Sequence, residues 1–380
     1  MKKFLFLAPL LISAGGGVAT ATRRLGPTGT HDLAWLRANG STRLSTITAA
    51  DLERVAVTEL AAHNRRMNAM VSAFAVRVDK RDGVDATGQR LTGTMTEVDE
   101  YGRVRTQTTG KPGETYFPLR RYQFAAGYTA DFFRKKTAKD FVGVLENAQA
   151  AHRKAVVKEI RDRIFSPSNY DFEDFLTDGK IFNVKGFYNA DGILPPMGPN
   201  LEEFLGTHNH YLGFTALNAA ALDAMIDGVR EHNENAVVEV HVNAMQEAAL
   251  LAIPNFARAQ EVNVRVSVND TVATGITDRA QNNNRFLGTY RGADVWAKPW
   301  VFSNYGYALD ISDPALGIRH PDDVEDEGLR MIGQITTFPL QSDYWGAEFG
   351  IGVRRRGGAV VAQFNSPSAG TYQDPTGRTW

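Results

Sequence analysis

The chain has no cysteine among its 380 residues. That absence excludes disulfide bonds, thiolate metal sites and a cysteine nucleophile. An excess of charge of one sign is missing too, because 42 lysines and arginines stand against 43 aspartates and glutamates. A balanced charge does not fit a dedicated nucleic-acid-binding protein, so any contact with nucleic acid has to be local.

Long apolar runs are also missing, since no uninterrupted stretch reaches the roughly 20 residues that a membrane-spanning helix needs. The start of the chain nevertheless has the pattern of a secretory signal, with basic residues at 2–3, an apolar run at 4–12 and small residues at 19–21. Pro9 and the three glycines at 15–17 interrupt this pattern. Export therefore stays an alternative, while the remainder of the sequence gives no indication that a membrane is a partner.

The short motifs of common enzymes are absent as well. The sequence contains no Gly-x-Ser-x-Gly elbow and no glycine-rich phosphate loop ending in Lys-Ser or Lys-Thr. No pair of carboxylates stands out for acid–base work. These absences argue against common enzyme classes, and no cofactor is expected.

The first half of the chain alternates between polar extended segments and helical patterns. Residues 1 to about 47 are rich in Gly, Thr and Ala and indicate an arm that becomes ordered on a partner. Thr48 is positioned to cap a helix that ends before Ala75. Residues 74–125 then show a period of two and little apolar surface, with a hairpin expected at 94–108, so this β excursion should rest on something else.

A single long helix is predicted over 129–165. The segment contains no proline, and its apolar residues recur at steps of three and four. At 1.5 Å per residue it would be roughly 55 Å long, more than a compact domain of this size needs. Such a helix should act as a strut that ends at Ser166-Pro167.

The second half predicts a mixed body. After a loop-like stretch at 166–213, helical and strand patterns alternate, namely at 215–232, 236–242, 243–253 and 262–268. Near the end, residues 349–354 and 359–364 flank Gly357-Gly358, which predicts a closing hairpin. The fold class is therefore α+β.

This order of arm, β excursion, long helix, mixed body and C-terminal hairpin resembles the tailed-bacteriophage major capsid protein family, which has the Hong Kong 97-type fold. Four short segments also look like their counterparts in actinobacterial-phage capsid proteins: 206–211, 219–232, 238–243 and 348–353. The resemblance covers about residues 48–365.

The resemblance implies five parts: an N-terminal arm and helix (1–73), an E-loop (74–127), a P-domain with a spine helix (128–213), an A-domain (214–340), and a C-terminal hairpin and tail of the P-domain (341–380). It also implies a non-enzymatic virion capsid subunit, assembled in the host cytoplasm as pentamers and hexamers around double-stranded DNA. Scaffold, portal and decoration proteins are possible partners. An encapsulin-type compartment shell is the alternative with the same fold.

Basic residues of the E-loop are candidates for contacts between subunits: Lys80, Arg90, Arg103, Arg105, Lys111, Arg120 and Arg121. Arg354, Arg355 and Arg356 are candidates for facing DNA, although a solvated turn that pairs with a neighbour's acids is the favoured interpretation.

Some relatives join subunits by an isopeptide bond between an E-loop lysine and a neighbour's asparagine, promoted by a glutamate. Here Lys80 and Lys111 offer the amine, but Glu348 and Asn365 do not stand in a matching context. The sequence therefore predicts a non-covalent shell.

Three histidines suggest a second function class, a secreted metal-dependent hydrolase. His208 and His210 alternate on a possible strand, and His241 lies on another. The sequence identifies no acidic ligand and no supporting partner for them, so no metal is predicted. His152, on the apolar stripe of the long helix, is expected to be a packing residue.

Overall fold

The computed structural model describes residues 40–82, 115–200, 204–259, 285–337 and 340–375, with a few single residues between them. The signal-like segment, the arm up to residue 39, most of the predicted hairpin at 94–108 and the predicted strand at 262–268 lie outside the described residues. The chain forms two compact units. The first comprises the described residues up to Asn68 with Tyr122–Arg153 and Gly328–Ala347, and the second comprises the remainder.

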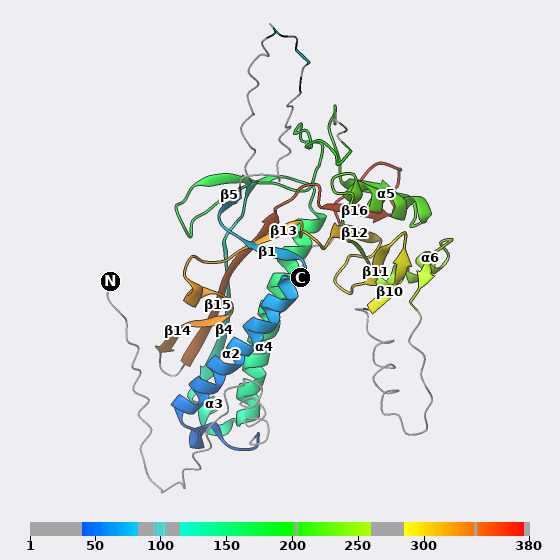
Figure 1. The fold of residues 1–380 in the computed structure, drawn as a ribbon. Helices are drawn as coiled ribbons and strands as arrows, with labels where there is room; N and C mark the ends of the chain where they lie inside the picture. The colour runs from blue at the N-terminus through cyan, green and yellow to red at the C-terminus, as the bar shows by residue number, and fades with distance from the viewer. Residues whose placement is uncertain are drawn as a thin grey trace, which may run out of the picture. The chain divides into compact units, whose positions relative to one another are not determined.

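The first unit is built on two helices, α2 (Ala49–Val71) and the first part of α4 (Ala138–Phe165), which lie side by side (Figure 1). The backbone N–H of Asp51 donates to Thr48 Oγ1 (3.2 Å), so Thr48 caps α2 as predicted. Val55 of α2 and Leu145 of α4 are fully buried in one core with Trp345.

The predicted single helix over 129–165 is wrong at one point. It is divided into α3 (Ala130–Lys135) and α4, because Lys136 is extended and the backbone of Thr137 forms a β-bridge with Arg43. The Asp140 side chain accepts hydrogen bonds from the N–H (2.9 Å) and hydroxyl (3.0 Å) of Thr137, which starts a new helix. At 1.5 Å per residue, the 28 residues of α4 span about 42 Å.

Strands of the first unit add to this core. The strand β14 (Arg330–Thr337) pairs antiparallel with the first half of β15 (Leu340–Val353), and η1 (Leu44–Thr46) packs on α3.

In the second unit, the other half of β15 pairs with β13 (Leu316–Arg319), which pairs in parallel with β1 (Ala75–Val78). The strand β4 (Arg120–Thr129) also pairs with β15.

The largest element of the second unit is a seven-stranded mixed sheet in the order β7-β16-β12-β8-β11-β10-β9. Its strands are β7 (Tyr211–Phe214), β8 (Val238–Val242), β9 (Ala257–Arg258), β10 (Arg285–Tyr290), β11 (Ala293–Ala297), β12 (Tyr305–Asp310) and β16 (Ala359–Phe364). The helix α5 (Ala219–Arg230) packs its buried apolar face on β8, β12 and β16. Shorter helical segments are η2 (Ala244–Gln246), α6 (Glu247–Leu251) and η3 (Val324–Asp326).

Two small sheets complete the second unit. One pairs β5 (Tyr170–Glu173) with β6 (Ile181–Val184), and the other pairs β2 (Arg81–Asp82) with β3 (Thr115–Tyr116). Among the described residues, no helix is long and apolar enough to cross a membrane.

The predicted C-terminal hairpin is wrong. The two strands lie in different sheets, because β15 pairs with β13 and β14 whereas β16 pairs with β12 and β7. All six residues of β16 are buried, as expected for a strand with a neighbour on each side. The N–H groups of Arg354 and Arg355 both donate to the carbonyl of Ala315, which holds the chain as it passes from one sheet to the other.

Candidate functional site

Two of the histidines considered from the sequence lie on an extended segment just before β7. The carbonyl of His208 accepts a hydrogen bond from Ala190 (2.7 Å), and the N–H of His210 donates to the carbonyl of Tyr188 (2.6 Å). On its other side, the carbonyl of His210 accepts from Val361 in β16 (2.8 Å). Since side chains alternate along an extended chain, His208 and His210 point to the same side.

The end of α5 supplies two more side chains. Asn218 caps the start of this helix by accepting a hydrogen bond from the N–H of Ala221 (2.9 Å). At the other end Glu231 is the C-cap, and its N–H donates to the carbonyl of Asp227 (2.8 Å). His232 follows directly. The C-terminal end of a helix carries partial negative charge, which favours a nearby cation.

Four side chains from these two segments converge and form the histidine cluster: His208, His210, Glu231 and His232. The three Nε2 atoms and Glu231 Oε1 are all close to one another. Their separations are 2.6 Å (His208–Glu231), 2.8 Å (His208–His210), 3.1 Å (His210–His232), 3.3 Å (His208–His232), 3.3 Å (His210–Glu231) and 3.4 Å (His232–Glu231).

The hydrogen bond made by Nδ1 of His210 shows which of the two ring nitrogens carries the proton. Nδ1 lies 2.6 Å from the carbonyl oxygen of Ala359. A carbonyl only accepts hydrogen bonds, so Nδ1 carries the proton and Nε2 of the neutral ring turns a lone pair toward the cluster. Burial lowers the pKa of His210 to about 4, which keeps the ring neutral at pH 7.

The carboxylate of the cluster is charged. Burial is the largest single influence on Glu231 and acts to raise its pKa, but its contacts with the histidines, that with His208 first, together outweigh burial. The pKa of Glu231 is therefore held below its usual range. A carboxylate and three imidazole nitrogens are donors that suit zinc.

Aromatic rings enclose the cluster. Tyr188 packs edge-on against His208 and His210, with ring centroids 5.6 and 5.4 Å apart, and Phe204 lies 5.1 Å from His208 and 5.2 Å from His232. The side chains of His210 and His232 are only 1% and 5% exposed, whereas that of Glu231 is 34% exposed. The cluster is therefore reached from the side of the carboxylate.

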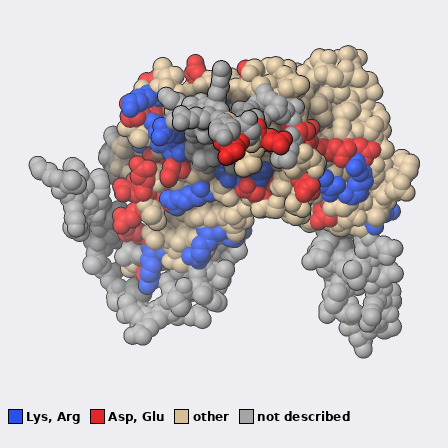
Figure 2. Space-filling view, turned by 45° about the horizontal axis from the view of Figure 1, so that its top comes forward, with Lys and Arg blue, Asp and Glu red and all other residues tan. Residues whose placement is uncertain are grey.

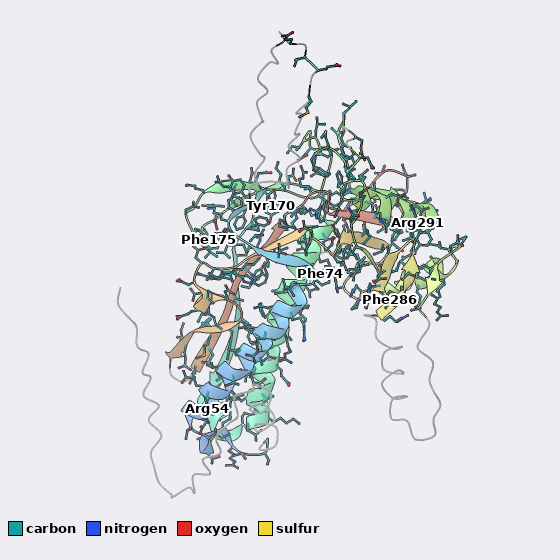
Figure 3. All side chains as sticks on the ribbon, viewed as in Figure 1. Arg54, Phe74, Tyr170, Phe175, Phe286 and Arg291 are labelled. Atoms are coloured by element: carbon teal, nitrogen blue, oxygen red, sulfur yellow. The ribbon has the colours of Figure 1, made fainter. Side chains whose placement is uncertain are left out.

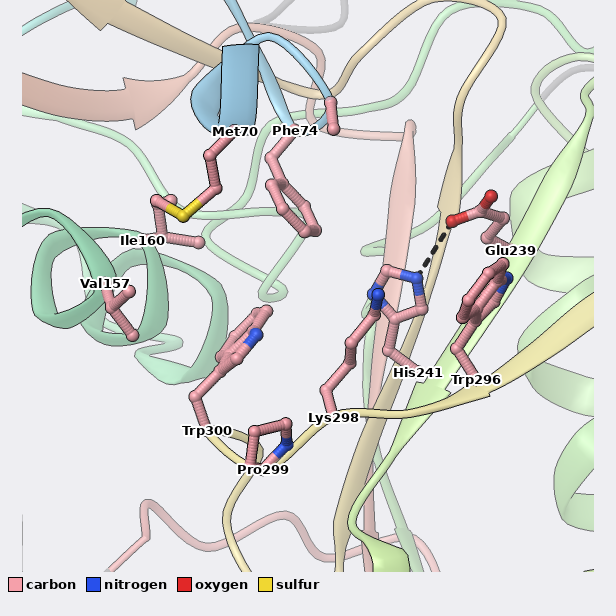
Figure 4. A pocket seen from close by; sticks show the side chains of 11 residues that line it. Met70, Phe74, Val157, Ile160, Glu239, His241, Trp296, Lys298, Pro299 and Trp300 are labelled. Atoms are coloured by element: carbon pink, nitrogen blue, oxygen red, sulfur yellow. Dashed lines mark hydrogen bonds and ion pairs between the residues drawn. The ribbon is translucent and has the colours of Figure 1, made fainter. Parts of the chain in front are cut away.

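The grouping of His208 and His210 with His241 is wrong. Figure 4 shows His241 in a different pocket, of about 380 Å³, where its Nε2 lies 2.9 Å from Glu239 Oε2. Its Nδ1 contacts the hydroxyl of Tyr307 (2.6 Å). Glu231 and His232 were not predicted as site residues, although both stand at the end of a predicted helix. No local pattern reveals that this helix end packs on residues 208–210.

The candidates for contacts between subunits have partners within the chain wherever the structure describes them. Lys80 Nζ pairs with Asp174 (2.9 Å) and Asp178 (2.5 Å). Arg120 donates to the hydroxyl of Tyr170 (3.0 Å), and Arg121 pairs with Glu348 (2.7 Å). Arg90, Arg103, Arg105 and Lys111 lie outside the described residues. Their contact roles stay predictions.

The three arginines considered as candidates for facing DNA differ in exposure. Arg356 is fully buried, and its guanidinium donates to the carbonyl of Gly186 (2.9 Å) and to both carboxylate oxygens of Asp191. Arg356 is thus a structural residue in this chain rather than a residue available to a phosphate. Arg354 and Arg355 are partly exposed and both pair with Asp313, so their contact with DNA stays a prediction.

On the face drawn in Figure 2, the described residues form no broad patch of side chains of one charge. Lysine and arginine side chains are interspersed there with aspartate and glutamate. Such a surface fits many local ion pairs better than the wide basic patch of a nucleic-acid-binding protein.

The order and pairing of these elements define an α+β protein with the Hong Kong 97-type capsid fold, as the sequence predicted. A structure from Mycobacterium phage Patience matches it with a TM-score of 0.62 and 20% identity, over 87% of this chain and 91% of that chain. No protein-family model and no curated protein matches the sequence.

Two further solved structures are similar at lower scores. The capsid of a native GTA particle has a TM-score of 0.46 and 14% identity, over 78% of this chain and 90% of that chain. An encapsulin complex from Synechococcus elongatus has a TM-score of 0.43 and 12% identity, over 80% and 90%.

Proposed function

We propose that this chain is the major capsid protein of a tailed bacteriophage, a non-enzymatic subunit that assembles as pentamers and hexamers into an icosahedral shell. The observation that carries the proposal is the match in fold to the phage structure over nearly the whole of both chains. The shell encloses double-stranded DNA without reading its sequence, and it is assembled in the host cytoplasm with scaffold, portal and decoration proteins as partners.

Exposed apolar side chains support self-association. Phe175 at the β5–β6 turn, labelled in Figure 3, is 64% exposed, and Ile181 at the start of β6 is 70% exposed. In the first unit, β14 exposes Met331 and Ile335 and stands at the end of its sheet path. Apolar side chains and a strand at the end of a sheet are both suited to burial against another copy of the chain.

The experiment is expression of the chain alone, followed by sedimentation and negative-stain electron microscopy. We expect capsomers or closed shells rather than a 41.8 kDa species. A monodisperse monomer at high concentration would contradict the proposal. A matched pair of variants tests the surface: Phe175→Asp places a charge on the exposed apolar site and should reduce assembly, whereas Glu173→Asp on the same hairpin should not.

Analysis of what particles from infected cells contain distinguishes a phage shell from the encapsulin alternative. A phage shell holds nuclease-protected double-stranded DNA, and a compartment shell holds a cargo protein. The secreted hydrolase is not supported, because His241 lies apart from His208 and His210.

A further inference from the structure

The histidine cluster contains more close contacts than its hydrogens can turn into hydrogen bonds. Six close contacts join the four ligand atoms, but Nε2 of His210 has no proton, because Nδ1 donates to Ala359. The Nε2 atoms of His208 and His232 carry at most one hydrogen each, so at most two hydrogens serve six contacts. A cation at the centre would satisfy all four atoms at once.

We propose that the histidine cluster binds one zinc ion in a closed, structural site that fastens the end of α5 to the segment entering β7. Around zinc with bonds of 2.0–2.1 Å, four tetrahedral ligand atoms lie about 3.3–3.4 Å apart. The observed separations run from 2.6 to 3.4 Å, so binding of zinc requires the closest pair to move apart by about 0.7–0.8 Å and the other pairs by less.

His210 has the supporting contact of a zinc ligand. Metal-bound histidines almost always donate their other nitrogen to a carbonyl or carboxylate, as His210 does to Ala359. The backbone of Gly357 packs on the ring of His232, because an added Cβ would lie 2.7 Å from that ring. The rings of Tyr188 and Phe204 restrict the access of water.

The number of ligands decides the kind of site. Four protein ligands occupy every position of a tetrahedron, whereas a catalytic zinc keeps one position for water. The site therefore holds structure and does not activate water. It joins His208 to His232 across the sequence, and so it closes the loop that contains β7 and α5.

The test is zinc content by mass spectrometry of the untagged protein, expressed with added zinc and dialysed against metal-free buffer. We expect about one zinc per subunit in the wild type and a loss of roughly tenfold or more in His232→Gln. His241→Gln is the matched control, since His241 is also buried beside a glutamate but lies outside the cluster. It should keep its zinc.

A second measurement needs no variant. Addition of Co²⁺ to metal-free wild-type protein should produce the strong visible absorption of tetrahedral cobalt, and Zn²⁺ should displace it. The inference is overturned if the wild type holds only traces of zinc and shows no such spectrum, or if His232→Gln keeps a full equivalent. Zinc content and cobalt absorption can both be measured on any soluble oligomer. Their outcome is therefore independent of the assembly test of the proposed function.

Discussion

Asp174 Oδ2 lies 2.9 Å from Arg319 Nη1, and the two side chains are 0% and 3% exposed. The same guanidinium also donates to the carbonyl of Phe117 (3.1 Å) and to the hydroxyl of Thr177 (2.8 Å). This buried pair connects the β5–β6 turn to β13. Removal of Asp174 would leave the buried Arg319 as an uncompensated charge.

Asp174→Ala should therefore destabilise the fold by about 3–5 kcal/mol, because Arg319 would stay buried without its counter-charge. Denaturant unfolding of purified capsomers measures this. Asp171→Ala is the control on the same hairpin, since Asp171 is exposed, and it should change stability by less than about 0.5 kcal/mol. Equal effects of the two substitutions would show that the buried pair has no special role.

The buried pair of His63 and His152, with Nε2 and Nδ1 3.0 Å apart, predicts a loss of stability in acid. Burial, assisted by the charges of Arg66 and Arg153, lowers the pKa of His63 to about 4. Between pH 6.5 and 4 the unfolded chain binds a proton that the folded chain refuses, so stability falls as the pH falls through this window. The effect of His63 on the free energy of unfolding over this pH window amounts to up to about 3 kcal/mol.

The measurement is the free energy of unfolding from pH 4 to 7.5 for wild type and His63→Gln. Other buried histidines also contribute, so the difference between the two curves isolates His63. The variant should lose less stability on acidification than the wild type. Parallel curves would mean that His63 does not drive the response.

Two glycines should respond to alanine in opposite directions. A Cβ at Gly350 in β15 would lie 2.0 Å from the carbonyl oxygen of Pro118, so Gly350→Ala must displace backbone and should destabilise by more than about 2 kcal/mol. Gly143 lies inside α4 with open space around it, and Gly143→Ala should stabilise by about 0.5–1 kcal/mol. Thermal unfolding would reveal both, and a stable Gly350→Ala protein would contradict the close approach.

The shell should be non-covalent. Burial acts to lower the pKa of Lys80, but Asp178 and Asp174 outweigh it and raise the pKa, so the amine is protonated and cannot attack an amide. Mature particles boiled in detergent should give a single band at the monomer mass. A ladder of multimers that is lost in Lys111→Arg, but not in Lys80→Arg, would identify the other E-loop lysine as a crosslinking residue.

The sequence by itself determined the features that depend on near neighbours along the chain. The Thr48 cap, the apolar period of α4 and the helix α5 follow from steps of three and four residues, and together with the order of elements they predicted the fold class. His208 and His210 also share a side because they are two residues apart on an extended segment.

Only the tertiary structure decided the contacts between distant segments. The bridge from Arg43 to Thr137 interrupts the long helix, and β16 joins a sheet that buries both of its faces instead of pairing with β15. His232 meets His210 because α5 packs across β16, and nothing in the local pattern of either segment encodes that meeting. Periodicity determines which side chains share a face, but burial against the rest of the chain selects the partner of that face.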